Sequence, residues 1–159
     1  MDVEPCRSPD LDVEDSFWED LEGGKTVALL ARGRSMLPLY PSGTRFLLRR
    51  AEPGDLAPGD LVLLRSGTRA VLHRLIGFTP GVPMRLLTKG DWLSDGDDPW
   101  PLGALCGKAV GVERPGWPRR RPGALGGPLA LALARFSPAL GRCLGILRRA
   151  RGTERGPSR

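Results

Sequence analysis

Ser35 and His73 are the two side chains of this sequence whose types and surroundings best suit covalent chemistry. A serine hydroxyl is a poor nucleophile at neutral pH, so it needs a base within hydrogen-bonding reach. Ser35 lies in the segment Gly-Arg-Ser-Met-Leu-Pro at 33–38. Gly33 permits a sharp bend and Pro38 fixes its exit, so we expect a tight turn that exposes the hydroxyl. Such a turn is able to aim main-chain N–H groups at a developing oxyanion.

His73 is the only histidine in the chain, and it lies inside an apolar run. If residues 70–78 form a strand, alternation puts His73 on the same face as Val71 and Leu75. An imidazole in such a place is a candidate general base for Ser35. The loop at 89–98 carries four carboxylates suited to orienting this ring, namely Asp91, Asp95, Asp97 and Asp98.

The sequence disfavours metal and disulfide chemistry. Cys6, Cys106 and Cys143 are widely spaced and form no C-x-x-C pair, which argues against a disulfide framework and against a zinc site. A single histidine argues against a His-rich cluster. The acidic loop lacks the complete spacing of a calcium-binding EF-hand. We therefore expect neither a metal nor a cofactor.

The strands that must position Ser35 and His73 come from short apolar runs separated by Gly, Pro and Asp. These runs lie at 25–31, 46–48, 61–64, 70–78, 84–88 and 102–112. Short runs at regular intervals with turn residues between them are typical of a mainly β domain. The 22 glycines and 16 prolines also disfavour a long helical bundle. We expect a compact sandwich or a compact coiled β-sheet over roughly residues 25–113.

The flanking segments carry opposite charges: residues 1–24 hold nine acidic residues and one arginine, whereas residues 114–159 hold eleven arginines and one glutamate. The first predicts a short acidic helix that ends at Gly23. Leucines at steps of four and three with an arginine rim predict a basic amphipathic helix near the C-terminus. We divide the chain into an acidic segment (1–24), the β domain (25–113), a Pro/Gly/Arg linker (114–128), this helix (129–150) and a disordered tail (151–159).

The basic helix at 129–150 has three interpretations. It packs on the β domain as a solvated helix, or its leucine face and basic rim bind an anionic membrane surface. Nucleic-acid binding is the least favoured, because no recognised binding motif accompanies the charge. The sequence has no apolar run of about 18 residues, and its N-terminus is acidic. We expect no membrane anchor and no export signal, hence a cytoplasmic protein, with peripheral membrane contact as the alternative.

Five sequence boxes give the chain a family resemblance. They are G-x-S-M-x-P at 33–38, P-G-D-L-V-L-L at 58–64, V-L-H-R-L-I at 71–76, T-K-G-D-x-x-x-x-x-D at 88–97 and G-K-A-V-G-V at 107–112. In this order, over about residues 27–112, they resemble the type I signal peptidases and the LexA-like serine peptidases. Most bacterial signal peptidases carry lysine where His73 stands. The chain therefore resembles the Ser–His branch, found in archaea and the endoplasmic reticulum.

The resemblance implies a serine endopeptidase with Ser35 as the nucleophile and His73 as the general base. It also implies that Asp97 orients His73, with Asp98 as the near alternative, and that Asp91 organises its own turn through hydrogen bonds to the backbone. The implied substrate is an extended peptide, such as the leader of a precursor protein, cut by a Ser–His dyad or a Ser–His–Asp triad without a cofactor.

Departures from the family pattern leave other functions open. Trp92 and Leu93 replace the asparagines usual after Lys-Gly-Asp, and Thr44 replaces the aspartate usual after Gly43. These changes bear on substrate recognition. The alternatives are a LexA-like self-cleaving regulatory module and an inactive fold that binds peptides. No Ala-Gly or Cys-Gly bond precedes Ser35, which disfavours self-cleavage.

Overall fold

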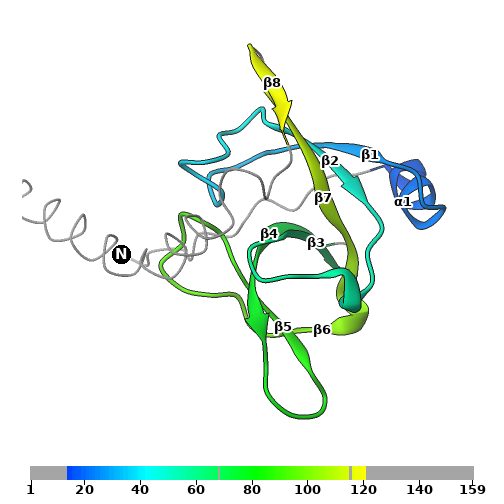
Figure 1. Cartoon of the computed structure of the whole chain (residues 1–159), viewed down its shortest axis with the longest axis vertical. Helices are drawn as coiled ribbons and strands as arrows, with labels where there is room; N and C mark the ends of the chain where they lie inside the picture. The colour runs from blue at the N-terminus through cyan, green and yellow to red at the C-terminus, as the bar shows by residue number, and fades with distance from the viewer. Residues whose placement is uncertain (1–13, 68, 115, 121–159) are drawn as a thin grey trace, which may run out of the picture.

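The computed structural model describes residues 14–67, 69–114 and 116–120 (Figure 1). The basic helix expected at 129–150 and the tail expected at 151–159 lie outside the described residues. The same is true of residues 1–13 and of 121–128 in the expected linker.

In the described part of the chain, eight antiparallel strands form one sheet, so the expectation of a mainly β domain is confirmed. The strands are β1 (Val27–Leu30), β2 (Arg45–Arg49), β3 (Leu61–Ser66), β4 (Arg69–Phe78), β5 (Arg85–Lys89), β6 (Trp100–Pro101), β7 (Leu105–Arg114) and β8 (Trp117–Arg120). Their order is β1-β2-β7-β3-β4-β5-β6, and β8 pairs with β7. Figure 1 shows β7 as the long strand between β2 and β3. Strand β1 therefore lies at one edge of the sheet.

The acidic helix α1 (Asp15–Glu22) precedes β1 and lies near its start (Figure 1). Gly24 ends the turn after the helix with a φ of 81°, in the left-handed region that favours glycine. Trp18 and Leu21 are buried, and the guanidinium of Arg65 lies 4.4 Å from the centre of the Trp18 ring. The helix thus places its apolar side on the sheet and its acidic side chains toward solvent.

The core lies on both faces of the sheet. Leu61 and Leu63 of β3 belong to the cluster beneath α1, whereas Val62 and Leu64 belong to a second cluster with Leu75 and Leu86. All four β3 residues are fully buried, which is why this strand reads as a continuous apolar run. Each such side chain stabilises the fold by roughly 1.5–3 kcal/mol relative to exposure. Two short 3₁₀ turns, η1 (Pro53–Asp55) and η2 (Leu102–Ala104), join the strands.

Strand β8 lies inside the segment that we expected to be an irregular linker, so that expectation is wrong for residues 117–120. Gly116, with a φ of 76°, lies in the turn that returns the chain along β7. After this turn the main chains of Arg114 and Trp117 pair with each other, and such pairing does not depend on an apolar pattern of side chains. Pro118 is tolerated because β8 is an outer strand that pairs with β7.

Candidate active site

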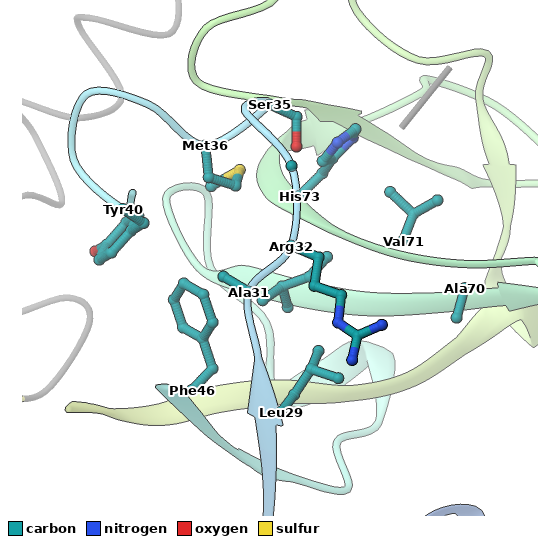
Figure 2. A pocket seen from close by; sticks show the side chains of 12 residues that line it. Leu29, Ala31, Arg32, Ser35, Met36, Tyr40, Phe46, Ala70, Val71 and His73 are labelled. Carbon is teal, nitrogen blue, oxygen red and sulfur yellow. The ribbon is translucent and has the colours of Figure 1, made fainter. Parts of the chain in front are cut away.

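Ser35 and His73 line the same cavity, although the first lies between β1 and β2 and the second in the middle of β4. Figure 2 shows the Ser35 hydroxyl directed toward the imidazole ring of His73. The cavity has a volume of about 30 Å³, and its other walls are mostly apolar: Leu29, Ala31, Met36, Tyr40, Phe46, Ala70, Val71 and Leu72. Among the described residues no hydrogen bond joins the two side chains. Catalytic hydrogen bonds are often long without a bound substrate.

The ring of His73 is held by Asp97. His73 is 1% exposed, and its Nδ1 lies 2.6 Å from Oδ2 of Asp97. An ionised carboxylate is only an acceptor, so Nδ1 must carry the hydrogen and donate it. Nε2 is buried and has no hydrogen-bond partner among the described residues. Its lone pair is therefore free to accept a proton.

Thr88 fixes the carboxylate of Asp97, and sequence reasoning assigned it no role. Its Oγ1 donates to the same Oδ2 at 2.7 Å, and its carbonyl accepts from the Asp97 N–H at 2.9 Å. The sequence feature that could have indicated this role is that Thr88 is the only hydroxyl residue of β5. Asp98, the alternative partner for His73, is exposed to solvent. The structure thus brings Asp97 against His73, and Nδ1 bonds to no other carboxylate in the described chain.

The bend that carries Ser35 runs from the end of β1 to the start of β2. Gly33 opens it with a φ of 92°, which favours glycine. The N–H of Trp92 donates to the Ser35 carbonyl at 2.8 Å. A Cβ added at Gly90 would lie 2.8 Å from the same oxygen, closer than ordinary packing allows. The loop at 90–98 therefore positions both Asp97 and the main chain of Ser35.

The carboxylate of Asp91 pairs with the guanidinium of Arg74, a partner that the sequence did not indicate. Nε and one terminal nitrogen of Arg74 donate to its two oxygens, both at 2.7 Å. The other terminal nitrogen donates to the carbonyl of Gly59 at 2.7 Å. The Arg74 and Asp91 side chains are 1% and 4% exposed. Burial lowers the pKa of Arg74, but its hydrogen bonds and charge attraction to Asp91 outweigh this and raise the pKa above its ordinary value.

Tyr40 connects this buried ion pair to the bend that carries Ser35. The guanidinium of Arg74 lies 6.0 Å from the centre of the Tyr40 ring, and the ring packs edge-on against Phe46 at 5.2 Å. Arg74 directly follows His73 in β4, so one guanidinium contacts the Ser35 bend, the turn at Gly59 and the loop of Asp97. This cluster joins three segments that are distant in the sequence next to the strand that carries His73.

Lys89 is the third buried charge in this region, with 3% of its surface exposed. Burial lowers its pKa, while Asp91 and Asp95 raise it and offset part of that effect. Lys89 does not line the cavity shared by Ser35 and His73. The base available to Ser35 in this cavity is thus the imidazole.

In the part of the chain that the structure describes, no three His, Cys, Asp or Glu side chains gather into a group fit to hold a metal ion. Nor does any helix there have the length and apolar character that crossing a membrane requires. Comparison with family models, curated proteins and solved structures gives no match to this chain. Its chemistry is therefore inferred from the geometry and from the sequence boxes.

Proposed function

We propose that this chain is a serine endopeptidase of the signal peptidase and LexA-like kind, with Ser35 as the nucleophile and His73 as the base. One observation carries the proposal. The buried imidazole has one nitrogen bonded to Asp97 at 2.6 Å and the other without a partner among the described residues, in the cavity that Ser35 also lines. A serine hydroxyl, an imidazole and an orienting carboxylate are the groups that acyl transfer through serine requires. The five sequence boxes support the same reaction.

The reaction starts when Nε2 of His73 takes the proton of the Ser35 hydroxyl, while Oγ attacks the carbonyl carbon of the scissile bond. The Asp97 carboxylate stabilises the imidazolium, and main-chain N–H groups of the Ser35 bend donate to the oxyanion. Nε2–H then protonates the leaving nitrogen as the C–N bond breaks, which leaves an ester on Ser35. Water hydrolyses this ester, with His73 again acting as the base.

In the part of the chain that the structure describes, β1 pairs only with β2, and its other edge suits an extended peptide. Ala31 exchanges main-chain hydrogen bonds with the start of β2: its N–H donates to the Thr44 carbonyl at 2.7 Å, and its carbonyl accepts from the Gly43 N–H at 3.0 Å. In an antiparallel pair the neighbouring residues face the other way, so main-chain groups of Leu30 and Arg32 point toward the open edge. A peptide that pairs there lies beside the bend of Ser35.

The cavity beside His73 favours a small side chain in the substrate. Its volume of about 30 Å³ has room for about two water molecules, and its walls are mostly apolar. We therefore propose that a small apolar residue, such as alanine, occupies it next to the bond that is cut. The cytoplasmic location and the contact of segment 129–150 with anionic lipid stay predictions from the sequence.

The test uses the full purified chain and a library of random octapeptides, with the products identified by mass spectrometry. We expect cleavage after small residues, and we expect Ser35→Ala to abolish it. His73→Gln should abolish it as well, because Gln supplies no base. Thermal unfolding of each variant shows whether the fold is intact.

Three other results contradict the proposal. If the chain cuts itself and no added peptide, its own mass falls and the self-cleaving alternative holds. If Ser35→Ala leaves peptide cleavage unchanged, the activity belongs to another group or to a contaminant. If no peptide is cut but library members bind to the chain, the inactive peptide-binding fold is the better description.

A further inference from the structure

A second hollow adjoins the cavity of Ser35 and His73. This groove has a volume of about 520 Å³ and lies between helix α1 and strand β1. Leu29 and Arg32 line both the groove and the cavity, so the two spaces meet at these residues. A peptide paired with the free edge of β1 would pass through this groove on its way to Ser35.

Arg32 is the charged side chain at the junction. It is exposed, and its side chain makes no ion pair or hydrogen bond with another described residue. Figure 2 shows its guanidinium extending along the cavity beside Leu29. Apart from His73, no other residue that lines the cavity in the described chain has an ionisable nitrogen. The guanidinium is therefore available to a ligand.

The other charges of the groove are less well placed to select a substrate. Arg45 lies 3.6 Å from Glu113, and Asp20 lies 2.6 Å from Lys25. Glu14 stands at the start of α1 and does not line the cavity. Arg32 is thus the unpaired charge that reaches both the groove and the cavity.

We infer that Arg32 selects peptides that carry Asp or Glu beside the residue that occupies the cavity. The inference rests on the proposed endopeptidase function and adds the charge of its substrate. Guanidinium binds carboxylate through two parallel hydrogen bonds, which gives geometric selectivity as well as attraction. Because the pair forms at the surface, salt screens it.

The experiment takes one peptide cut by the wild-type chain and places Glu, Gln or Lys at each position flanking the small residue. We expect kcat/KM for the Glu peptide to exceed that for Gln roughly fivefold at low salt, the size of an exposed ion pair. Arg32→Gln should remove the preference, and Arg32→Glu should reverse it in favour of Lys. Arg34→Gln is the matched control, because Arg34 is also exposed and lines neither space. It should keep the wild-type preference.

The outcomes separate the two proposals. Equal kcat/KM values for peptides with Glu, Gln or Lys at both positions overturn the inference but not the proposed peptidase function. A preference for Glu that survives in Arg32→Gln also overturns it, because another group then recognises the carboxylate. Failure of the wild-type chain to cut any library peptide overturns the proposed function, and the inference falls with it.

Discussion

The main-chain oxygen of Ser35 lies where a side chain at position 90 would have to go: a Cβ on Gly90 would stand 2.8 Å from it. Real Cβ atoms do not approach a carbonyl oxygen this closely, so the contact requires glycine. It joins the bend of the proposed nucleophile to the loop that holds the proposed positioning carboxylate, Asp97. A displacement on either side would therefore move the proposed nucleophile relative to Asp97.

Gly90→Ala is therefore expected to lower peptide cleavage at least tenfold, because a displacement of about 1 Å at a reacting centre costs up to a hundredfold in rate. Gly96→Ala in the same loop is the control, since its Cβ would meet the Thr88 carbonyl at an ordinary 3.5 Å. Initial rates and thermal unfolding are measured for both. Equal activity of the two variants would contradict the role of the close contact.

Asp97→Asn is expected to lower kcat by about a thousandfold or more with little change in KM, because an amide does not hold Nδ1–H in the required tautomer. The measurement is steady-state kinetics on the best library peptide. Asp98→Asn is the matched control and should behave like the wild-type chain. A similar loss in both variants would show that the net charge of the loop, and not the bond to His73, matters.

Thr88→Val removes one of the two donors to Asp97 while it conserves the shape of the side chain. We expect kcat to fall roughly tenfold and Thr88→Ser to restore most of it, since a hydroxyl donor of this kind contributes about 1–3 kcal/mol. The pH profile of kcat should move as well, because Thr88 acts through Asp97 and His73. An unchanged profile with reduced stability would mark Thr88 as a packing residue.

The sequence predicted most of the strands and indicated candidate site residues, because both leave local signals. Apolar runs ended by Gly, Pro and Asp indicated six strands, and the boxes around Ser35 and His73 indicated a reactive pair. The partners of Asp91 and Thr88 left no such signal, because an ion pair to Arg74 and a hydroxyl contact to Asp97 depend on sheet register. Strand β8 was missed since main-chain pairing with β7 carries no apolar pattern.

Asp91→Asn should destabilise the chain by about 3–5 kcal/mol, because it leaves the buried guanidinium of Arg74 without its counter-charge. Urea unfolding measures the loss. The double variant Arg74→Met with Asp91→Leu removes both charges and should recover most of it. Arg74→Met and Asp91→Leu are also measured singly, and if their two effects simply add in the double variant, the pair is not coupled.

Burial lowers the pKa of Lys89 below its ordinary 10.5. Between the two values the unfolded chain binds more protons than the folded chain, so the contribution of Lys89 to the free energy of unfolding rises with pH. Lys89→Met should lack this rise, so the free energy of unfolding of the wild-type chain should increase relative to that of the variant as the pH approaches 10.5.

The pH dependence contributed by Cys106 has the opposite sign. Burial raises the pKa of its thiol, so its contribution to the free energy of unfolding falls as the pH rises above the ordinary pKa of 9.0. The wild-type chain and Lys89→Met both contain Cys106, so this effect cancels in the difference between their free energies of unfolding. The free energy of unfolding is measured with urea at each pH for the wild-type chain and for Lys89→Met. A difference between the two that does not change with pH would contradict the prediction.

The guanidinium of Arg74 contacts three stretches of chain that are remote in sequence: the carbonyl of Gly59, the carboxylate of Asp91 and the ring of Tyr40. None of these contacts exists until the strands carrying them have paired. In a nascent or partly unfolded copy the proposed nucleophile and base are therefore not aligned, and the proposed peptidase activity arises only with the finished fold. Such coupling of the proposed activity to folding would spare neighbouring proteins from damage while the chain is being made.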